Sequence, residues 1–277
     1  MDIFERIGKI DNRIIYTLLV IVLLIPLARP IGLPVSVGPY VQKSYAVIDK
    51  LQAGDIIFME AGYSISGASD VEPQTIAIIK HLMKKGVKMV WTSVIAEGGS
   101  IVENLMAPHE KAGKKYGEDW VNLGYLSGVE NAISTYCRDL KKAYPKDFRG
   151  NSTETVPILK DIKTVADAKM FIFFTTGNAD MYVRQVSPYK IPLVGGLIST
   201  ISLQAEPYVQ SGQLAGILSG LRGGAEYELL MKDPGIGVAS MDAQSMGHVL
   251  IVLFIILANV SYFVTRSRDV AKRQKGA

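Results

Sequence analysis

The residues of this chain that are able to do chemistry lie where the predicted strands end, and they form no familiar catalytic motif. Carboxylate, hydroxyl and amide side chains are interleaved there with glycine: Glu60, Ser64, Glu97, Gly98, Gly99, Ser100, Ser127, Thr176, Gly177, Asn178 and Asp180. Exposed backbone amides at helix N-termini suit an anionic or hydroxyl-rich ligand, so these residues predict a polar binding crevice. The alternative is purely structural, because tight turns between strands and helices need small polar residues.

Enzymatic chemistry is weakly indicated. Glu60, Glu97 and Asp180 could act as acid and base, and a hydrolase would use Glu60, Glu97, Ser100 or Asp180, but the pattern pairs no nucleophile with a base. The chain has no Gly-x-Gly-x-x-Gly after its first strand, no Gly-x-x-x-x-Gly-Lys-[Ser/Thr] and no Gly-x-Ser-x-Gly. We therefore expect no nucleotide cofactor, and a membrane-anchored hydrolase ranks third among the functions considered.

Metal and nucleic-acid sites are not expected. Cys137 is the single cysteine, and His81, His109 and His248 are far apart in sequence. We expect His81 and His109 to be surface or boundary residues. The net charge of +4 equals that of the tail from Arg266 onward, and the other 25 basic and 25 acidic residues cancel. The basic balance is thus a sign of membrane topology, with no nucleic-acid partner.

Strand-like and helix-like patterns alternate between the two apolar segments. Strands are predicted at 55–60, 87–94, 120–125, 169–176 and 191–195, and helices at 73–85, 101–116, 129–144, 179–186 and 203–231. This alternation predicts an α/β domain with a mostly parallel sheet, either a Rossmann-like or a flavodoxin-like three-layer sandwich. Three Ser-x-x-Glu sequences, which begin at Ser69, Ser100 and Ser127, have the form of capping boxes at helix starts.

Glycine recurs every fourth residue at Gly212, Gly216, Gly220 and Gly224. On a helix these positions share one face, and each glycine costs about 1 kcal/mol relative to alanine. A smooth groove on such a helix would permit close packing, either inside the domain or between subunits. We favour an oligomer interface by a small margin.

Two apolar segments flank the α/β domain. Residues 14–34 form the first predicted transmembrane helix, preceded by an amphipathic cytoplasmic segment at 1–13, with a cleaved signal peptide as the alternative. Residues 246–265 form the second, and the basic tail at 266–277 marks its cytoplasmic side. The domain at 35–245 would then be extracytoplasmic, in a two-pass cell-membrane protein with both termini in the cytoplasm.

These features favour a membrane-anchored domain that self-associates, or joins related membrane subunits, in a structural or scaffolding assembly of the lipid bilayer. The alternative is an extracytoplasmic ligand-binding or sensory module that uses the crevice.

Overall fold

The computed structural model describes residues 10–275, with side chains described for residues 10–267. The chain divides into two compact units. One unit, residues 34–238, contains the sheet. The other combines the chain up to Leu33 with the chain from Ala239 onward. The predicted amphipathic segment at 1–13 and the end of the basic tail lie largely outside the described residues.

The sheet unit contains six parallel strands, ordered β3-β2-β1-β4-β5-β6. They are β1 (Ile56–Gly62), β2 (Lys88–Ser93), β3 (Trp120–Tyr125), β4 (Met170–Thr175), β5 (Leu193–Leu197) and β6 (Gly216–Ser219). Ile57 of β1 pairs with Met89 on one side and Met170 on the other, so β1 is central. The predicted parallel α/β fold is confirmed, and the strand order is the Rossmann one.

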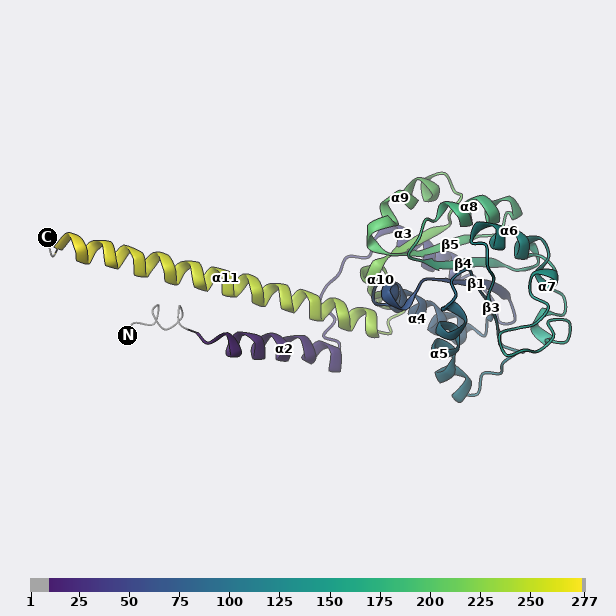
Figure 1. Ribbon diagram of the computed structural model, residues 1–277, viewed down its shortest axis with the longest axis horizontal. Coiled ribbons are helices and arrows are strands. Elements are labelled where there is room, and N and C mark those ends of the chain that lie inside the picture. Colours follow the sequence, from purple (N-terminus) through teal and green to yellow (C-terminus); the bar gives the residue numbers. More distant parts are fainter. Residues whose placement is uncertain (1–9, 276–277) are drawn as a thin grey trace. The chain divides into compact units, whose positions relative to one another are not determined.

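Helices cover both faces of this sheet. They are α3 (Pro39–Ile48), α4 (Ala68–Lys85), α5 (Gly98–Lys111), α6 (Glu130–Arg138), α7 (Leu140–Ala143), α8 (Asp180–Val186), α9 (Ser199–Gln210) and α10 (Gly220–Leu230). In Figure 1, α6, α8 and α9 lie above the sheet, and α4 and α5 lie below it.

Alternate strand residues serve the two faces. Phe58 and Phe171 pack with Tyr136 and Tyr182 in one core cluster, while Met59 and its neighbours pack under α4 and α5 in the other. All of β4 is buried, as expected for a strand covered on both sides.

The predicted helix at 203–231 is wrong. The structure places the end of α9, the edge strand β6 and all of α10 in this segment. Gly212 has φ +79° in the turn after α9, and Gly216 lies in β6 with no room for a side chain beside Ser44. A short buried strand and a helical turn are both apolar, so periodicity alone does not separate them.

The predicted capping boxes do not form either. Gly67, Glu97 and Val129 precede α4, α5 and α6, and none of them caps its helix with a side chain. A capping box instead joins Thr164 and Asp167 at a 3-10 turn.

The first turn of α4 supplies caps for two other helices. The Asp70 carboxylate accepts hydrogen bonds from the backbone N–H of Ser199 at 2.8 Å and of Leu221 at 3.0 Å, in the first turns of α9 and α10. One turn further along α4, the buried Gln74 amide donates to the carbonyl oxygens of Leu197 (3.0 Å) and Gly220 (2.8 Å). Asp70 and Gln74 thereby join the ends of β5 and β6 to α4.

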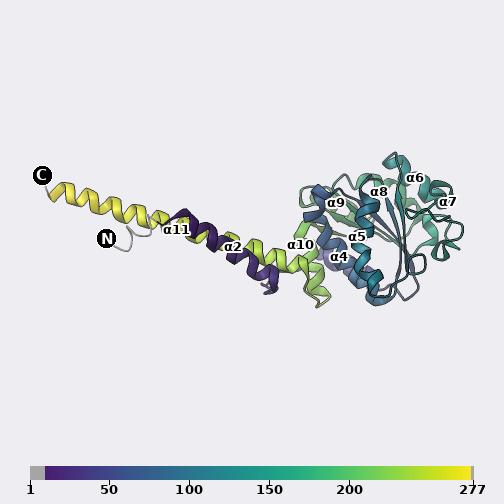
Figure 2. The ribbon, with the colours of Figure 1, turned by 60° about the horizontal axis from the view of Figure 1, so that its bottom comes forward.

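The second unit is helical. It contains α2 (Asn12–Ala28) and most of α11 (Ile236–Lys275), which lie alongside each other (Figure 1, Figure 2), with Leu23 close to Gly247. The buried Asp242 carboxylate accepts hydrogen bonds from three successive backbone N–H groups, those of Ile31 (2.7 Å), Gly32 (2.8 Å) and Leu33 (2.9 Å). This bond set joins the segment after α2 to α11.

One helix among the described residues is long and apolar enough to cross a membrane. The qualifying stretch is Ile236–Ser267; its most apolar 18-residue window has a mean hydropathy of 2.2, and only 11% of that window is buried. At about 1.5 Å per residue it exceeds a bilayer core of about 30 Å. The apolar α2 has only 17 residues, so the structure shows one such helix where the sequence predicts two.

Replacing Asp70 with alanine should destabilise the sheet unit by about 2–3 kcal/mol, because two helix N-termini each lose a cap worth about 1 kcal/mol and the amides stay partly buried. Asp70→Asn keeps one acceptor oxygen and should cost less. Chemical unfolding of the full chain in detergent measures both. Asp161→Ala, at an exposed position outside this junction, is the control; equal losses in all three variants would contradict the role of Asp70.

Candidate functional site

About half of the predicted crevice residues lie in loops at the carboxyl ends of the strands, and the structure brings two of these loops into contact. The strand order reverses between β1 and β4, so this is the point at which a doubly wound sheet opens a crevice. A side chain at Gly67, after β1, would collide with Thr176, after β4. The two loops therefore touch and leave little space between them.

Glu97 has a structural partner at this edge. Its carboxylate accepts a hydrogen bond from the backbone N–H of Ile65 at 2.9 Å, while the Ser64 and Ser66 hydroxyls are 2.8 Å apart. The Glu97 bond links the loop after β1 to the loop after β2. Ser64 and Glu97 thus lie near each other, as predicted, but they bind the protein itself.

Gly98 and Gly99 are needed for packing. Gly98 lies against Ser93 and the carbonyl oxygen of Ala61, and Gly99 lies beneath the Phe148 ring. Ser100 is exposed inside α5, and Ser127 is exposed in the loop before α6. Neither serine is joined to the other predicted site residues by a hydrogen bond within the described part of the chain.

The residues after β4 also satisfy one another. The Gly177 N–H donates to the Thr175 hydroxyl at 2.9 Å, and the Asn178 side chain bonds both the backbone and the carboxylate of Asp180. The second Asp180 oxygen accepts from the Tyr208 hydroxyl at 2.8 Å. Asp180 therefore serves to connect α8 with α9.

Glu60 is a core residue and does not line the crevice. It is fully buried and accepts hydrogen bonds from the Thr92 hydroxyl, the Val94 N–H (2.7 Å) and the Tyr136 hydroxyl (3.0 Å). Burial raises the pKa of the Glu60 carboxyl from 4.5 to about 7, although the three donors oppose the shift. No hydrogen bond joins Glu60, Glu97, Ser100 and Asp180 to one another among the described residues, so the predicted hydrolase set does not assemble.

His81 is buried, contrary to the sequence prediction. Its Nδ1 lies 2.8 Å from the Tyr227 hydroxyl and its Nε2 lies 3.2 Å from the Asp49 carboxylate. Burial lowers the pKa of the imidazole, with Asp49 opposing this shift. Since Tyr227 is wholly buried, this chain of contacts connects α4 with α10 and with the end of α3.

The four repeated glycines do not share a helix face. Gly212 is in a turn, Gly216 is in β6, and Gly220 and Gly224 are in α10. Gly220 is adjacent to Ser199 and Asp70, and Gly224 contacts the backbone of Pro73 and Gln74. Gly216, Gly220 and Gly224 therefore contact neighbouring elements of their own domain, and the predicted helical groove does not exist.

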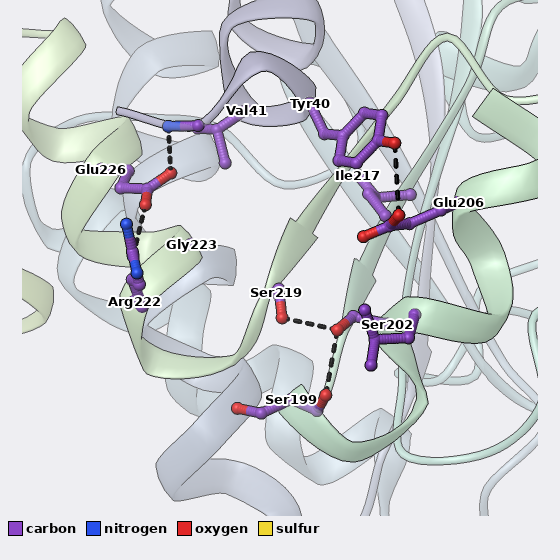
Figure 3. A pocket seen from close by; sticks show the side chains of 12 residues that line it. Tyr40, Val41, Ser199, Ser202, Glu206, Ile217, Ser219, Arg222, Gly223 and Glu226 are labelled. Atoms are coloured by element: carbon purple, nitrogen blue, oxygen red, sulfur yellow. Dashed lines mark hydrogen bonds and ion pairs between the residues drawn. The ribbon is translucent and has the colours of Figure 1, made fainter. Parts of the chain in front are cut away.

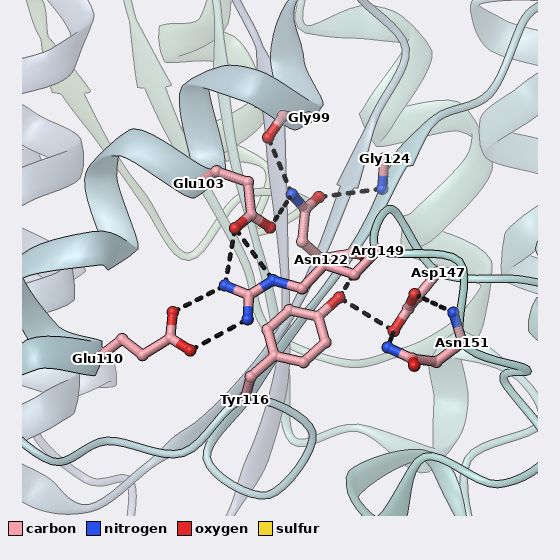
Figure 4. A network of polar contacts seen from close by, with 9 residues as sticks. All are labelled: Gly99, Glu103, Glu110, Tyr116, Asn122, Gly124, Asp147, Arg149 and Asn151. Carbon is pink, nitrogen blue, oxygen red and sulfur yellow. Dashed lines mark hydrogen bonds and ion pairs between the residues drawn. The ribbon is translucent and has the colours of Figure 1, made fainter.

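A network centred on Arg149 fixes the loop that follows α7 (Figure 4). Its guanidinium bonds the Glu103 carboxylate at 2.8 Å and the Glu110 carboxylate at 2.7 Å, and lies 3.8 Å from the Tyr116 ring centroid. Hydrogen bonds from the guanidinium hold the pKa of the Glu110 carboxyl below its usual value. Because Arg149 is fully engaged, it holds the loop in place and is not available for binding.

The open polar surface at this edge is a groove between α6 and α8, here named the α6–α8 groove, with a volume of about 670 Å³. Its polar lining includes Asn131, Ser134, Arg138, Asn178, Arg184 and Gln185. Only Asn178 belongs to the site set predicted from the sequence. The arginines were missed because they lie on helices away from the strand ends.

The charges in this groove are unevenly paired. Arg184 forms two hydrogen bonds to Glu130, at 2.9 and 2.8 Å, and Gln185 donates to the same carboxylate. Hydrogen bonds from Arg184 and Gln185 lower the pKa of Glu130 to about 2, so this carboxylate stays charged. Arg138 forms no hydrogen bond or ion pair with the described residues. The groove thus carries one uncompensated positive charge among amide and hydroxyl groups.

Val129, which lines the groove, has φ +48°, which is rare for a β-branched residue.

Among the described residues, no group of three or more His, Cys, Asp and Glu side chains is placed to hold a metal ion. Comparison of the chain with protein-family models, curated proteins and solved structures finds no match.

Burial of Glu60 predicts a pH dependence of stability. Its folded pKa of about 7 exceeds the ordinary value of 4.5, so the folded state binds the proton more tightly than the unfolded chain. Protonation of Glu60 therefore contributes about 3 kcal/mol to the free energy of unfolding. The full contribution is present below pH 4.5 and is lost as the pH rises through 7. Glu60→Gln should remove this dependence. Unfolding midpoints of both proteins from pH 5 to 8 test the prediction, and parallel curves would contradict it.

Proposed function

We propose that the protein is a membrane-anchored ligand-binding module whose α6–α8 groove takes an anionic, hydroxyl-bearing ligand. The observation that carries the proposal is Arg138, a cation in the groove lining without an ion-pair partner. A ligand carboxylate or phosphate would neutralise the charge of Arg138. Charge-assisted hydrogen bonds of this kind are stronger than those between neutral groups. Asn131 and Ser134 are in place to bond ligand hydroxyls.

The paired arginine supports the same ligand class. Glu130 keeps Arg184 oriented beside the groove through two hydrogen bonds, so the binding surface is partly organised before a ligand arrives. The groove also includes Val129 and Asn178, in the loops after β3 and β4, at the edge where parallel α/β sheets bind ligands.

Anions should bind the full chain in detergent, as measured by a rise in its unfolding temperature with glucose 6-phosphate or inorganic phosphate but not with glucose. Arg138→Gln should weaken binding about tenfold or more, because a hydrogen bond to a charged group contributes about 1.5–3 kcal/mol. Lys146→Gln removes the same charge at an exposed position outside the groove and should leave binding unchanged. A shift that survives Arg138→Gln would overturn the proposal.

We further propose a two-pass topology, with α2 and α11 both in the membrane, the sheet unit outside the cell and both termini in the cytoplasm. The Asp242 bonds to residues 31–33 support a helical hairpin, and the basic residues from Arg266 onward, at the end of α11, support the orientation. The short α2 would span by means of residues 29–34 or local thinning of the bilayer.

This topology is testable by thiol labelling, because the single native cysteine, Cys137, is buried and should give little background. In intact cells a membrane-impermeant maleimide should label Lys160→Cys, in the sheet unit, and spare Ser267→Cys until the membrane is permeabilised. Both positions are exposed. Labelling of both, or of Ser267→Cys alone, would contradict the topology.

Self-association into a scaffold stays a prediction of the sequence. It no longer has the glycine repeat in its favour, since Gly216, Gly220 and Gly224 contact neighbouring elements of the same domain. For this reason the ligand-binding function is the better supported of the two.

A further inference from the structure

The sheet unit contains a second cavity, whose lining and chemistry differ from those of the α6–α8 groove. It has a volume of about 350 Å³ and lies among α3, α9, β6 and the start of α10 (Figure 3). No residue lining it belongs to the α6–α8 groove. What it binds can be argued separately, because the two sites share no side chain.

Part of the cavity wall is apolar. Val41 of α3 and Ile217 of β6 are buried side chains that face it, and the Tyr40 ring stands beside them. Leu203 of α9 also lines it, with 72% of its surface exposed. A large apolar side chain so exposed beside a cavity offers a contact for the apolar body of a ligand.

The hydroxyl groups of the cavity already donate hydrogen bonds to other groups of the protein. Ser219 donates to the Ser202 oxygen at 2.7 Å, and Ser202 donates to the carbonyl oxygen of Ser199 at 2.9 Å. The Tyr40 hydroxyl donates to Glu206 at 3.3 Å. A hydroxyl has one donor and two acceptor sites, so what these groups still offer a ligand is mainly acceptor oxygens.

The two glutamates of the lining differ in their partners. Glu226 is nearly buried, lies 2.6 Å from the Arg222 guanidinium and accepts the Gly38 N–H at 2.9 Å. Glu206 accepts only the long hydrogen bond from Tyr40 and has no ion pair among the described residues. Figure 3 shows the two glutamates on opposite sides of the cavity, so Arg222 does not neutralise Glu206.

The other nearby cation, Lys43, does not pair with Glu206 either. The Lys43 ammonium lies 6.0 Å from the Tyr40 ring centroid but forms no ion pair with Glu206. Anionic ligands are disfavoured, because Asp70 already caps the adjacent N-termini of α9 and α10 through Ser199 and Leu221. The cavity therefore combines an apolar wall, free acceptor oxygens and one carboxylate without a counter-ion.

We propose that this cavity binds small amphipathic ammonium compounds, with the ammonium group on Glu206 and the alkyl chain against Val41, Leu203 and Ile217. An ammonium group has three donors and no acceptor, which matches a lining that offers acceptors. The positive charge of the ammonium group would neutralise the Glu206 carboxylate. The cavity is partly desolvated, and a charge-assisted hydrogen bond is stronger there than in water.

The test uses the full chain in mild detergent and three probes with the same alkyl chain, namely hexylammonium, 1-hexanol and hexanoate. Calorimetry should show hexylammonium binding best and hexanoate worst. Glu206→Gln should weaken hexylammonium binding about tenfold while leaving hexanol unchanged, because only the charged partner is lost. Glu118→Gln, the same substitution at an exposed position outside the cavity, should bind like the wild type.

A second variant separates the carboxylate from its neighbour. Tyr40→Phe keeps the ring and frees the Glu206 oxygen, so hexylammonium should bind at least as well as to the wild type. Hexanoate binding as tight as hexylammonium, or unchanged hexylammonium binding in Glu206→Gln, would overturn the proposal. All titrations are made with Arg138→Gln in the background, so that hexanoate bound at the α6–α8 groove does not contribute to either result.

The ammonium group has two possible sources, a soluble amine or a lipid headgroup. Repeating the titration in nanodiscs of phosphatidylethanolamine and of phosphatidylcholine distinguishes them. Competition with hexylammonium only in phosphatidylethanolamine would identify the headgroup as the natural ligand. Hexylammonium binding in both lipids that equals the binding in detergent would assign the site to a soluble amine. Either result supports an ammonium site.

Discussion

The arrangement of the sheet unit depends on one turn of α4, where Asp70 and Gln74 bond the backbone at the ends of β5 and β6. Neither α9 nor α10 has a side-chain cap of its own. Asp70 provides acceptors for both, and Gln74 donates to the carbonyl oxygens of Leu197 and Gly220. The helix α4 follows the central strand β1. These bonds therefore connect the helix after β1 to the β5–β6 edge of the sheet and fix the positions of α9 and α10.

Buried and half-buried carboxylates repeat this role elsewhere in the molecule. Glu228 accepts from the N–H groups of Gly235, Gly237 and Val238 at the start of α11. Asp242 does the same for three residues after α2. Glu226 holds the N-terminus of α3 through Gly38. Unpaired backbone N–H groups are costly when buried, so acids placed at chain junctions stabilise the fold without taking part in chemistry.

This internal use of acids explains which surfaces remain for ligands. At the strand ends, Glu97 and Asp180 are occupied by Ile65 and by Tyr208, and the β1 and β4 loops touch through Gly67 and Thr176. The uncompensated charges lie further out, on helices: Arg138 in the α6–α8 groove and Glu206 in the cavity beside α3. The two sites have opposite charge, and they therefore select opposite classes of ligand.

How much the sequence predicts varies with the range of the interactions involved. Alternating apolar runs and helical patterns are local, so they predicted the parallel α/β class and five of the six strands. The apolar run after His248 likewise marked the one helix, within the part of the chain that the structure describes, that is long and apolar enough to cross a bilayer. The glycine and serine patterns gave wrong predictions, namely a helical glycine groove and three capping boxes. A glycine at every fourth residue, or a Ser-x-x-Glu sequence, also occurs in segments that form neither structure.

The site depended on contacts between residues distant in sequence. Asp70 and Leu221 are 151 positions apart, and Glu130 and Arg184 are 54 apart, so no local pattern pairs them. Some of the predicted crevice residues, such as Ser64 and Asn178, lie in loops after strands, but Glu60 lies in the core. Whether such residues are available to a ligand depends on the hydrogen-bond partners that folding provides. Composition and periodicity determined the layers and the apolar segments. Only the tertiary structure decided which polar groups were satisfied internally and which were left to bind a ligand.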